Sequence, residues 1–169
     1  MVRRTEKIIE LRPDFILIGV SGLLTFQSPA IFRDLGLGAM KRVTKMAKAA
    51  GIPTQVHCCG RERELVKTAA EETDLSSINP LEVPPMGDCD LAEIKRSFGR
   101  KLGLMGNLHT TEVMLKGTPD VVGREARKCM DDAAAGGGFI LSTGDQCGRD
   151  TPEENIYRLI ETARRHGKY

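Results

Sequence analysis

Short apolar runs and longer amphipathic stretches alternate along this chain. The apolar runs are rich in β-branched residues, and between them apolar positions recur at helical spacing. The runs cover residues 14–20, 54–59, 75–82, 101–110 and 139–144. Runs of this kind are typical of strands buried in a parallel sheet. The alternation predicts an α/β fold of five βα units, with helices packed on one parallel sheet.

Local signals place the ends of the predicted helices, which cover residues 28–51, 61–72, 90–98 and 118–134, with a last helix that begins at Thr151. Ser28 followed by proline is typical of a helix start, and Gly51 is typical of a helix end. Thr151 and Glu154 have the spacing of a capping box for the last helix. In that helix the apolar spacing predicts a buried stripe made of Ile156, Leu159, Ile160 and Ala163.

The composition is that of an ordinary globular protein. The chain has 169 residues, of which 40% are hydrophobic and 28% charged, so we expect one domain over residues 1–169 with its own core. The net charge is +2 and the basic residues are scattered, whereas nucleic-acid binding needs a clustered basic face. No apolar run approaches the roughly 20 residues of a membrane helix, and the N-terminus does not resemble a signal peptide. We therefore expect a cytoplasmic protein without membrane or nucleic-acid partners, whose five cysteines stay reduced.

Polar side chains gather where the predicted strands end. In α/β proteins, ligands bind at the carboxyl ends of the strands. The residues at these ends are Ser21 and Gly22, His57 and Cys59, Asn79 and Glu82, Asn107 and His109, and Asp145 and Cys147. Two of the three histidines lie on this rim, which makes the rim the candidate site.

A possible metal site stands out on this rim. His57 and Cys59 are two residues apart, so their side chains point to one face of the strand and Cys58 points to the other. Cys147 can join them if the sheet curls. A His-Cys-Cys set with an open fourth position is typical of catalytic zinc, and thiolates favour zinc over magnesium. Glu82 is the candidate for a fourth or an outer ligand.

Each of these features also has a plain structural interpretation. A His-x-Cys pair alone is a weak signal, because buried cysteines are common in protein cores. His109 can cap the loop that follows it instead of contacting a substrate. Cys89 and Cys129 lie on or beside helices, and we interpret both as packing residues. The three glycines at 136–138 precede a strand instead of opening a helix, which indicates a turn and not a phosphate cradle.

Several segments resemble a known family. They are PTQVHCCGRERELVKTAAE, INPLEVPPMGDCDLAEIKRSFGRKLGLMGNLHT, GTPDVV and GGGFILSTGDQCGRDTPEENI. These segments resemble the C-terminal part of the uroporphyrinogen decarboxylase superfamily, and the resemblance extends over nearly the whole chain. It implies part of a (β/α)8 TIM-type barrel. The superfamily contains true decarboxylases and also zinc-dependent corrinoid methyltransferases, including the methylcobamide:coenzyme M enzymes.

Within that superfamily the chain is more similar to the methyltransferase branch. Those enzymes carry a His-x-Cys pair after one strand and a third cysteine after the last strand, which here fall on His57, Cys59 and Cys147. The decarboxylases carry Gly-His-Gly at the end of the last strand, where this chain has GDQC. The resemblance implies that zinc lowers the pKa of a substrate thiol. The thiolate would then attack the methyl group of a methyl-corrinoid held by a partner protein.

Three functions are considered. The first is a zinc-dependent methyltransferase, or a subunit of one, that moves a methyl group between a corrinoid and a small-molecule thiol. Its candidate catalytic residues are Glu82, Asn107 and His109. The second is a truncated relative that binds a corrinoid or a thiol without catalysis. The third is a decarboxylase, which the GDQC segment disfavours.

Five βα units do not complete an eight-stranded barrel, which takes about 250 residues. The first three strands of the family have no counterpart here. Two edge strands and one sheet face would therefore lack cover. We expect self-association to provide it. The alternatives are a complementary N-terminal barrel chain, or shielding by residues 2–12 and the helices.

Overall fold

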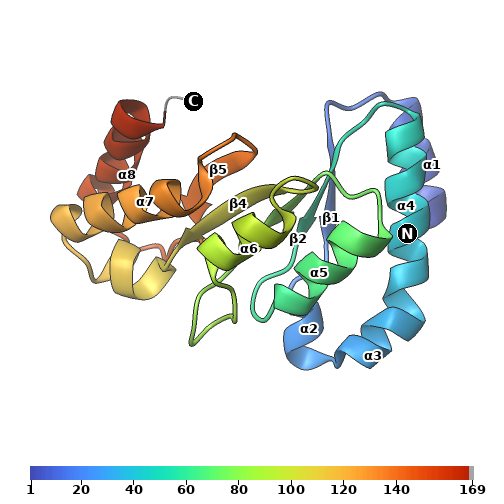
Figure 1. The fold of residues 1–169 in the computed structure, drawn as a ribbon, viewed down its shortest axis with the longest axis horizontal. Coiled ribbons are helices and arrows are strands. Elements are labelled where there is room, and N and C mark those ends of the chain that lie inside the picture. Colours follow the sequence, from blue (N-terminus) through green and yellow to red (C-terminus); the bar gives the residue numbers. More distant parts are fainter. Residues whose placement is uncertain (168–169) are drawn as a thin grey trace.

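The computed structural model of this protein describes residues 1–167 and contains one curved sheet with helices on its outer side (Figure 1). The strands are β1 (Ile16–Gly19), β2 (Thr54–His57), β3 (Ser77–Asn79), β4 (Gly103–Leu108) and β5 (Phe139–Thr143). They pair in chain order, and every neighbouring pair is parallel. The predicted parallel sheet of five βα units is confirmed.

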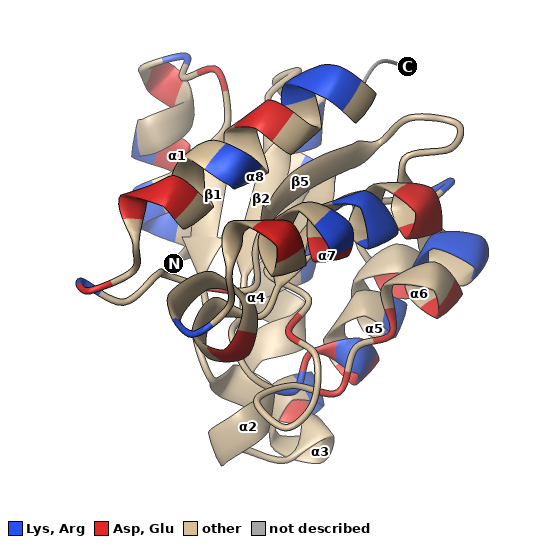
Figure 2. Ribbon diagram, turned by 90° about the vertical axis from the view of Figure 1, so that its left-hand side faces the viewer, with Lys and Arg blue, Asp and Glu red and all other residues tan. Residues whose placement is uncertain are grey.

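Helices precede the first strand, follow the last, and connect each strand to the next. They are α1 (Val2–Glu10), α2 (Leu23–Phe26), α3 (Pro29–Ile31), α4 (Leu37–Ala49), α5 (Arg63–Glu72), α6 (Leu91–Phe98), α7 (Pro119–Ala133) and α8 (Glu153–His166). Two π-helical segments are η1 (Phe32–Gly36) and η2 (Thr110–Leu115). The Ser28 side chain accepts a hydrogen bond from the Ile31 N–H at 3.3 Å, as expected of a cap. Acidic and basic segments alternate along α7 and α8 (Figure 2), consistent with the scattered charge of the sequence.

The hydrophobic core lies between the sheet and its helices. Strand alternation turns residues such as Ile18 and Val56 toward the helices, where both are buried. The opposite, concave face is open. Leu17 and Ile140, on the two edge strands, are 56% and 57% exposed.

The curvature of the sheet is visible in one contact across the concave face. Gln55 of β2 donates a hydrogen bond from Nε2 to the Met105 sulfur of β4 at 3.4 Å, passing over β3. A flat sheet would hold alternate strands too far apart for such a contact, because neighbouring strands are about 4.8 Å apart. Five parallel strands in chain order, in a curved sheet with helices on its outer side, are the arrangement of part of a TIM-type barrel.

The predicted buried stripe of the last helix is wrong at two of its four positions. Ile156 and Ile160 are 39% and 40% exposed, whereas Asn155 and Thr162 are buried. The reason is that Asn155 Nδ2 donates to the carbonyl oxygens of Met114 and Gly117 at 2.9 and 2.8 Å, which turns the polar side of α8 inward.

The predicted capping box at the start of α8 is also wrong. Pro152 occupies the cap position, and no side-chain hydrogen bond caps the helix. The Thr151 hydroxyl is instead buried, without a hydrogen-bond partner in the described part of the chain.

Other local predictions are confirmed. Cys89 and Cys129 are buried, at 3% and 8% exposure. Gly136, Gly137 and Gly138 all have positive φ, as expected of a turn that glycine permits. Within residues 1–167, the helices are too short or too polar to cross a bilayer.

Candidate metal centre

One group of metal-ligand side chains lies at the carboxyl ends of the strands. It consists of His57, Cys59 and Asp145, whose ligand atoms all lie within 4.8 Å of one another. The His57 Nε2 atom is 3.7 Å from Asp145 Oδ1, and all three residues are half-buried. Over residues 1–167 no second group of three His, Cys, Asp or Glu side chains meets this distance. The structure thus brings together residues at the carboxyl ends of β2 and β5, two strands that β3 and β4 separate in the sheet.

The segment after β2 places His57 and Cys59 on the concave side. Their backbone continues the sheet, because Val20 N–H donates to the His57 carbonyl at 2.9 Å and Gly22 N–H donates to the Cys59 carbonyl at 3.1 Å. Cys58 points the other way and is fully buried in the core, as the alternation predicted.

Asp145 is held by the backbone that surrounds it. Gly144 N–H donates to the Leu108 carbonyl at 2.6 Å, and the Thr143 hydroxyl donates to the Asp145 carbonyl at 2.7 Å. A Cβ atom at position 144 would lie 3.1 Å from the Leu108 oxygen, so glycine allows this close approach. Asp145 is predicted from the sequence to lie on the rim, but not to be a ligand. Its position two residues after β5 was the available signal.

Cys147, the third ligand predicted from the sequence, is not part of this group. It is half-buried and packs against the hydrophobic core, two residues farther along the same loop. The structure therefore brings together two of the three predicted ligands, with an aspartate beside them.

Glu82 lies next to the group and is 7% exposed. Its Oε2 atom accepts a short hydrogen bond from the Gly60 N–H. Burial raises the pKa of this carboxyl above its usual range, although the Gly60 hydrogen bond opposes the shift. The Asp145 charge raises the pKa further, whereas His109 and His57 lower it. Glu82 therefore interacts electrostatically with three other residues of the rim.

His109 acts as a cap, one of its two predicted interpretations. Its Nδ1 atom accepts hydrogen bonds from the N–H groups of Thr111 and Glu112, at 3.1 and 3.2 Å. Since Nδ1 is the acceptor, the proton of the neutral ring is assigned to Nε2. Asn107 is 5% exposed and donates from Nδ2 to the Leu81 carbonyl at 2.9 Å, so its amide faces the protein interior.

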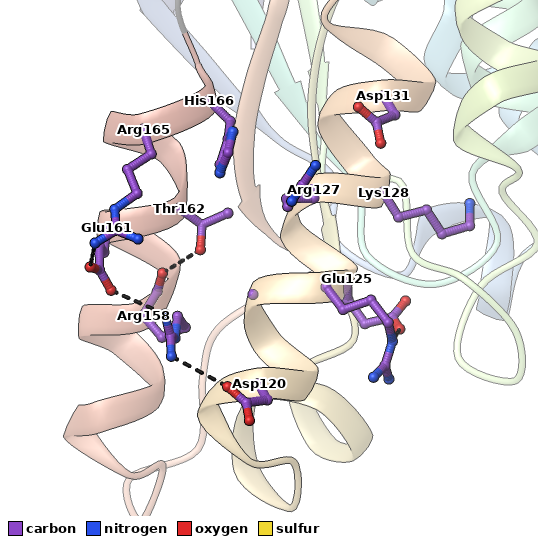
Figure 3. Close-up of a pocket in the computed structure, with 12 residues that line it drawn as sticks. Asp120, Glu125, Arg127, Lys128, Asp131, Arg158, Glu161, Thr162, Arg165 and His166 are labelled. Atoms are coloured by element: carbon purple, nitrogen blue, oxygen red, sulfur yellow. Dashed lines mark hydrogen bonds and ion pairs between the residues drawn. The ribbon is translucent and has the colours of Figure 1, made fainter.

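The largest cavity described lies away from this rim, between α7 and α8 (Figure 3). It has a volume of about 800 Å³, and none of the predicted site residues lines it. Arg158 is paired there with Asp120 and Glu161, both at 3.3 Å (Figure 3). The side chains that line the cavity carry both signs of charge, and most of these charges are in ion pairs. The cavity therefore does not favour one class of ligand.

The donor atoms at the rim are of the kinds that bind a small divalent cation. Zinc bonds to nitrogen, sulfur and oxygen are about 2.0–2.3 Å long, so two ligands at a tetrahedral angle lie about 3.4 Å apart. The 3.7 Å between His57 and Asp145 is close to that spacing and too long for a hydrogen bond. Imidazole, thiol and carboxylate groups are donors that a divalent cation such as zinc accepts.

Comparisons with known proteins agree on one family. The family model described as "Uroporphyrinogen decarboxylase (URO-D)" matches residues 5–166. Uroporphyrinogen decarboxylase of Dechloromonas aromatica (strain RCB) is 31% identical over 80 residues, which are 47% of this chain and 22% of that protein. Uroporphyrinogen decarboxylase of Azoarcus sp. (strain BH72) is 28% identical over 160 residues, which are 89% of this chain and 42% of that protein.

Among solved structures, a methyltransferase from Methanosarcina mazei superposes with a TM-score of 0.75 at 21% sequence identity. The match covers 99% of this chain and 46% of that one. At this identity the likeness establishes the fold alone. In each of these comparisons the chain spans less than half the length of the other protein.

Proposed function

The chain belongs to the uroporphyrinogen decarboxylase family, as its motifs indicated, and we propose that it is the metal-binding part of a zinc-dependent methyltransferase. The reaction would move a methyl group between a corrinoid and a small-molecule thiol. The observation that supports this proposal is the group formed by His57, Cys59 and Asp145, because a thiolate among the ligands favours zinc.

Under this proposal His57 and Cys59 hold the zinc ion. The loop after β5 supplies a third ligand, which is Asp145 by the present geometry and Cys147 by the sequence prediction. When bound, zinc would act as a Lewis acid that lowers the pKa of a coordinated thiol. The open fourth position would receive the substrate sulfur.

Glu82 would accept the thiol proton, and His109 would orient the substrate. The buried Glu82 carboxyl has a pKa above its usual range, which brings it closer to neutral pH and suits a proton acceptor. Its Oε2 is occupied by the Gly60 N–H, so the proton would go to Oε1. His109 would present the Nε2 proton to the substrate, because its Nδ1 is held by the backbone.

A second candidate function is binding without catalysis. In that case His57, Cys59 and Asp145 would hold a metal ion and a thiol or corrinoid ligand without methyl transfer. Decarboxylation is less well supported, even though the curated relatives carry that name. The GDQC segment stands where decarboxylases have Gly-His-Gly.

The concave face supports a further part of the proposal, which concerns partners. Leu17 and Ile140 are more than half exposed on the edge strands β1 and β5. A second copy, or a chain that carries the remaining βα units, would bury both residues and pair the free strand edges. Light scattering on this chain alone separates the two: an oligomer supports self-association, and a monomer supports a complementary chain.

The proposed function is tested by metal analysis followed by a transfer assay. Protein purified without added zinc should contain about one zinc per chain, and Cys59→Ser or His57→Ala should lower this to background. Cys58→Ala is the matched control, since Cys58 points into the core and should leave the zinc content unchanged. Methylcobalamin and a simple thiol then provide the substrates.

Absence of zinc from the wild-type protein would overturn the proposal. Zinc without methyl transfer, with complementary barrel chains added as well as without, would support the binding relative.

A further inference from the structure

Glu62 is a buried acidic residue to which the proposed function gives no role. It lies three residues after Cys59 and is 0% exposed. Its Oε2 atom accepts a hydrogen bond from the Leu81 N–H at 2.7 Å, while Oε1 is buried without a partner in the described part of the chain. Burial raises the pKa of this carboxyl well above its usual range, and Glu82 and Asp88 add to the shift. A group this costly to bury calls for a structural reason.

The reason lies in the backbone of Leu81. Leu81 has a φ of +62°, a left-handed conformation that costs a non-glycine residue about 1–2 kcal/mol. Both of its backbone polar groups bind buried side chains. Glu62 accepts from its N–H, and Asn107 Nδ2 donates to its carbonyl at 2.9 Å. The strained turn is therefore held from two sides by side chains of other elements.

The turn at Leu81 decides where the next residue points. Glu82 follows directly, and its carboxylate accepts from the Gly60 N–H beside the candidate metal centre. The Glu82 carbonyl accepts from the Cys89 N–H at 3.1 Å, so the chain is also fixed on its far side. If Leu81 left the left-handed conformation, the direction of the Glu82 side chain would change with it.

Two other roles for Glu62 do not agree with the geometry. A residue with no exposed surface cannot contact a substrate, which excludes a role as the catalytic acid. Over the described residues 1–167, Glu62 also belongs to no group of three ligand atoms within 4.8 Å, which argues against a second metal site.

We propose that Glu62 and Asn107 are positioning residues that clamp Leu81 and thereby aim the Glu82 carboxylate at the candidate metal centre. The functional part of this inference rests on the proposed zinc site, whereas the clamp itself does not. It gives Asn107, a catalytic candidate by sequence, a role that fits its buried amide.

The test compares Glu62→Gln with Glu62→Leu. Glutamine keeps an oxygen that can accept from the Leu81 N–H, whereas leucine of similar size leaves that N–H without a partner. Two properties are measured: hydrogen exchange of the Leu81 amide without metal, and Co²⁺ or Zn²⁺ affinity by chelator competition. Val66→Ala serves as the control, because Val66 is buried on α5, the helix that begins directly after Glu62, and its loss weakens packing without removing this hydrogen bond.

We expect Glu62→Leu to accelerate Leu81 exchange by about 100-fold or more. Loss of an outer-sphere partner typically costs 10- to 100-fold in metal affinity, and a loss of about that size is expected here. Glu62→Gln should stay within about threefold of wild type in both measurements. Asn107→Ala removes the clamp from the carbonyl side and should reproduce the loss of affinity, which keeps the test decisive if Glu62→Leu does not fold.

Two outcomes would overturn the inference. One is Leu81 exchange in Glu62→Leu that matches Val66→Ala, which would show that no clamp exists. The other is equal metal affinity in Glu62→Leu, Asn107→Ala and Val66→Ala, which would show that the clamp does not act on the site. A wild-type protein that binds no metal would instead refute the proposed function, and the exchange experiment would still decide the clamp.

Discussion

The Nε2 atom of His57 lies 3.7 Å from Oδ1 of Asp145, although His57 is the last residue of β2 and Asp145 follows β5. The separation exceeds a hydrogen bond and is close to the spacing of two ligands on one ion. Asp145 and the sequence-predicted Cys147 lie on the same loop and therefore compete for the role of third ligand.

Paired variants decide between these two residues. We expect Asp145→Asn to weaken Co²⁺ binding by 10-fold or more, since a neutral amide is a poor substitute for a ligating carboxylate. Cys147→Ser should change the affinity less than threefold and leave the sulfur-to-cobalt absorption intact. The reverse pattern, with weaker sulfur absorption in Cys147→Ser, would establish Cys147 as the ligand and Asp145 as its neighbour.

Glu62 should make the stability of the fold depend on pH. Its folded-state pKa is raised, so between the ordinary pKa of glutamate and the folded value the native state holds a proton that the unfolded state has lost. Stability contributed by this group is fully present below the unfolded pKa and declines as the pH rises. In that window the decline is about 1.4 kcal/mol per pH unit.

Glu62→Gln removes this titration and keeps the acceptor for Leu81. The variant should therefore be more stable than wild type at pH 7, and the advantage should shrink toward pH 4. Urea unfolding of both proteins at several pH values measures the difference. An advantage that is the same at pH 4 and pH 7 would contradict the assignment of a protonated Glu62.

Gly60 and Gly51 allow a comparison of the free energy that it costs to add a side chain at a position with positive φ. Both are left-handed, with φ of +90° and +73°. A Cβ at Gly60 would lie 1.9 Å from the Thr25 hydroxyl oxygen, whereas a Cβ at Gly51 meets nothing within 4 Å. The shared backbone cost is about 1–2 kcal/mol, and only Gly60→Ala adds a steric conflict.

We expect Gly60→Ala to lower the free energy of unfolding by about 2 kcal/mol more than Gly51→Ala does. Metal affinity should fall only in Gly60→Ala, because relief of the conflict with Thr25 would displace the backbone N–H that binds Glu82. Urea unfolding and metal titration of the two variants provide the measurement. Equal losses of stability would show that Thr25 moves aside without cost.

The cysteines should react at two distinct rates. Burial raises the pKa of Cys58 to about 11, so at pH 8 about one thiol in a thousand is ionised. Burial also raises the pKa of Cys89 and Cys129. Cys59 and Cys147 are half-buried, so iodoacetamide can reach them.

With iodoacetamide at pH 8, Cys59 and Cys147 should therefore be modified first, and zinc should protect Cys59. Peptide mass spectrometry over time follows each thiol. Modification of Cys58 at the rate of Cys59 would contradict the buried position of Cys58. Protection of Cys147 by zinc would favour Cys147 as a ligand.

Much of the fold could be predicted from the sequence, because its signals are local. A strand has a side-chain period of two, which places His57 and Cys59 on one face and Cys58 on the other. Helix caps act over three residues, and the predicted start at Asp90 is confirmed by its hydrogen bond from the Glu93 N–H at 2.8 Å.

Long-range contacts determine the rest of the fold and the site, and no periodicity in the sequence predicts these contacts. The loop after β5 has no regular geometry, so spacing cannot tell whether Asp145 or Cys147 meets His57. Asn155 turns α8 through hydrogen bonds to a distant loop, which exposes apolar positions that the helical pattern assigned to the core. In the sequence, Glu62 is an ordinary charged residue at a helix start. Its hydrogen bond with Leu81 exists only in the folded structure. Strand alternation and helix capping depend on neighbouring residues, so they can be predicted from the sequence. Which residues form the site depends on how far the sheet curls and on which loop atoms then meet.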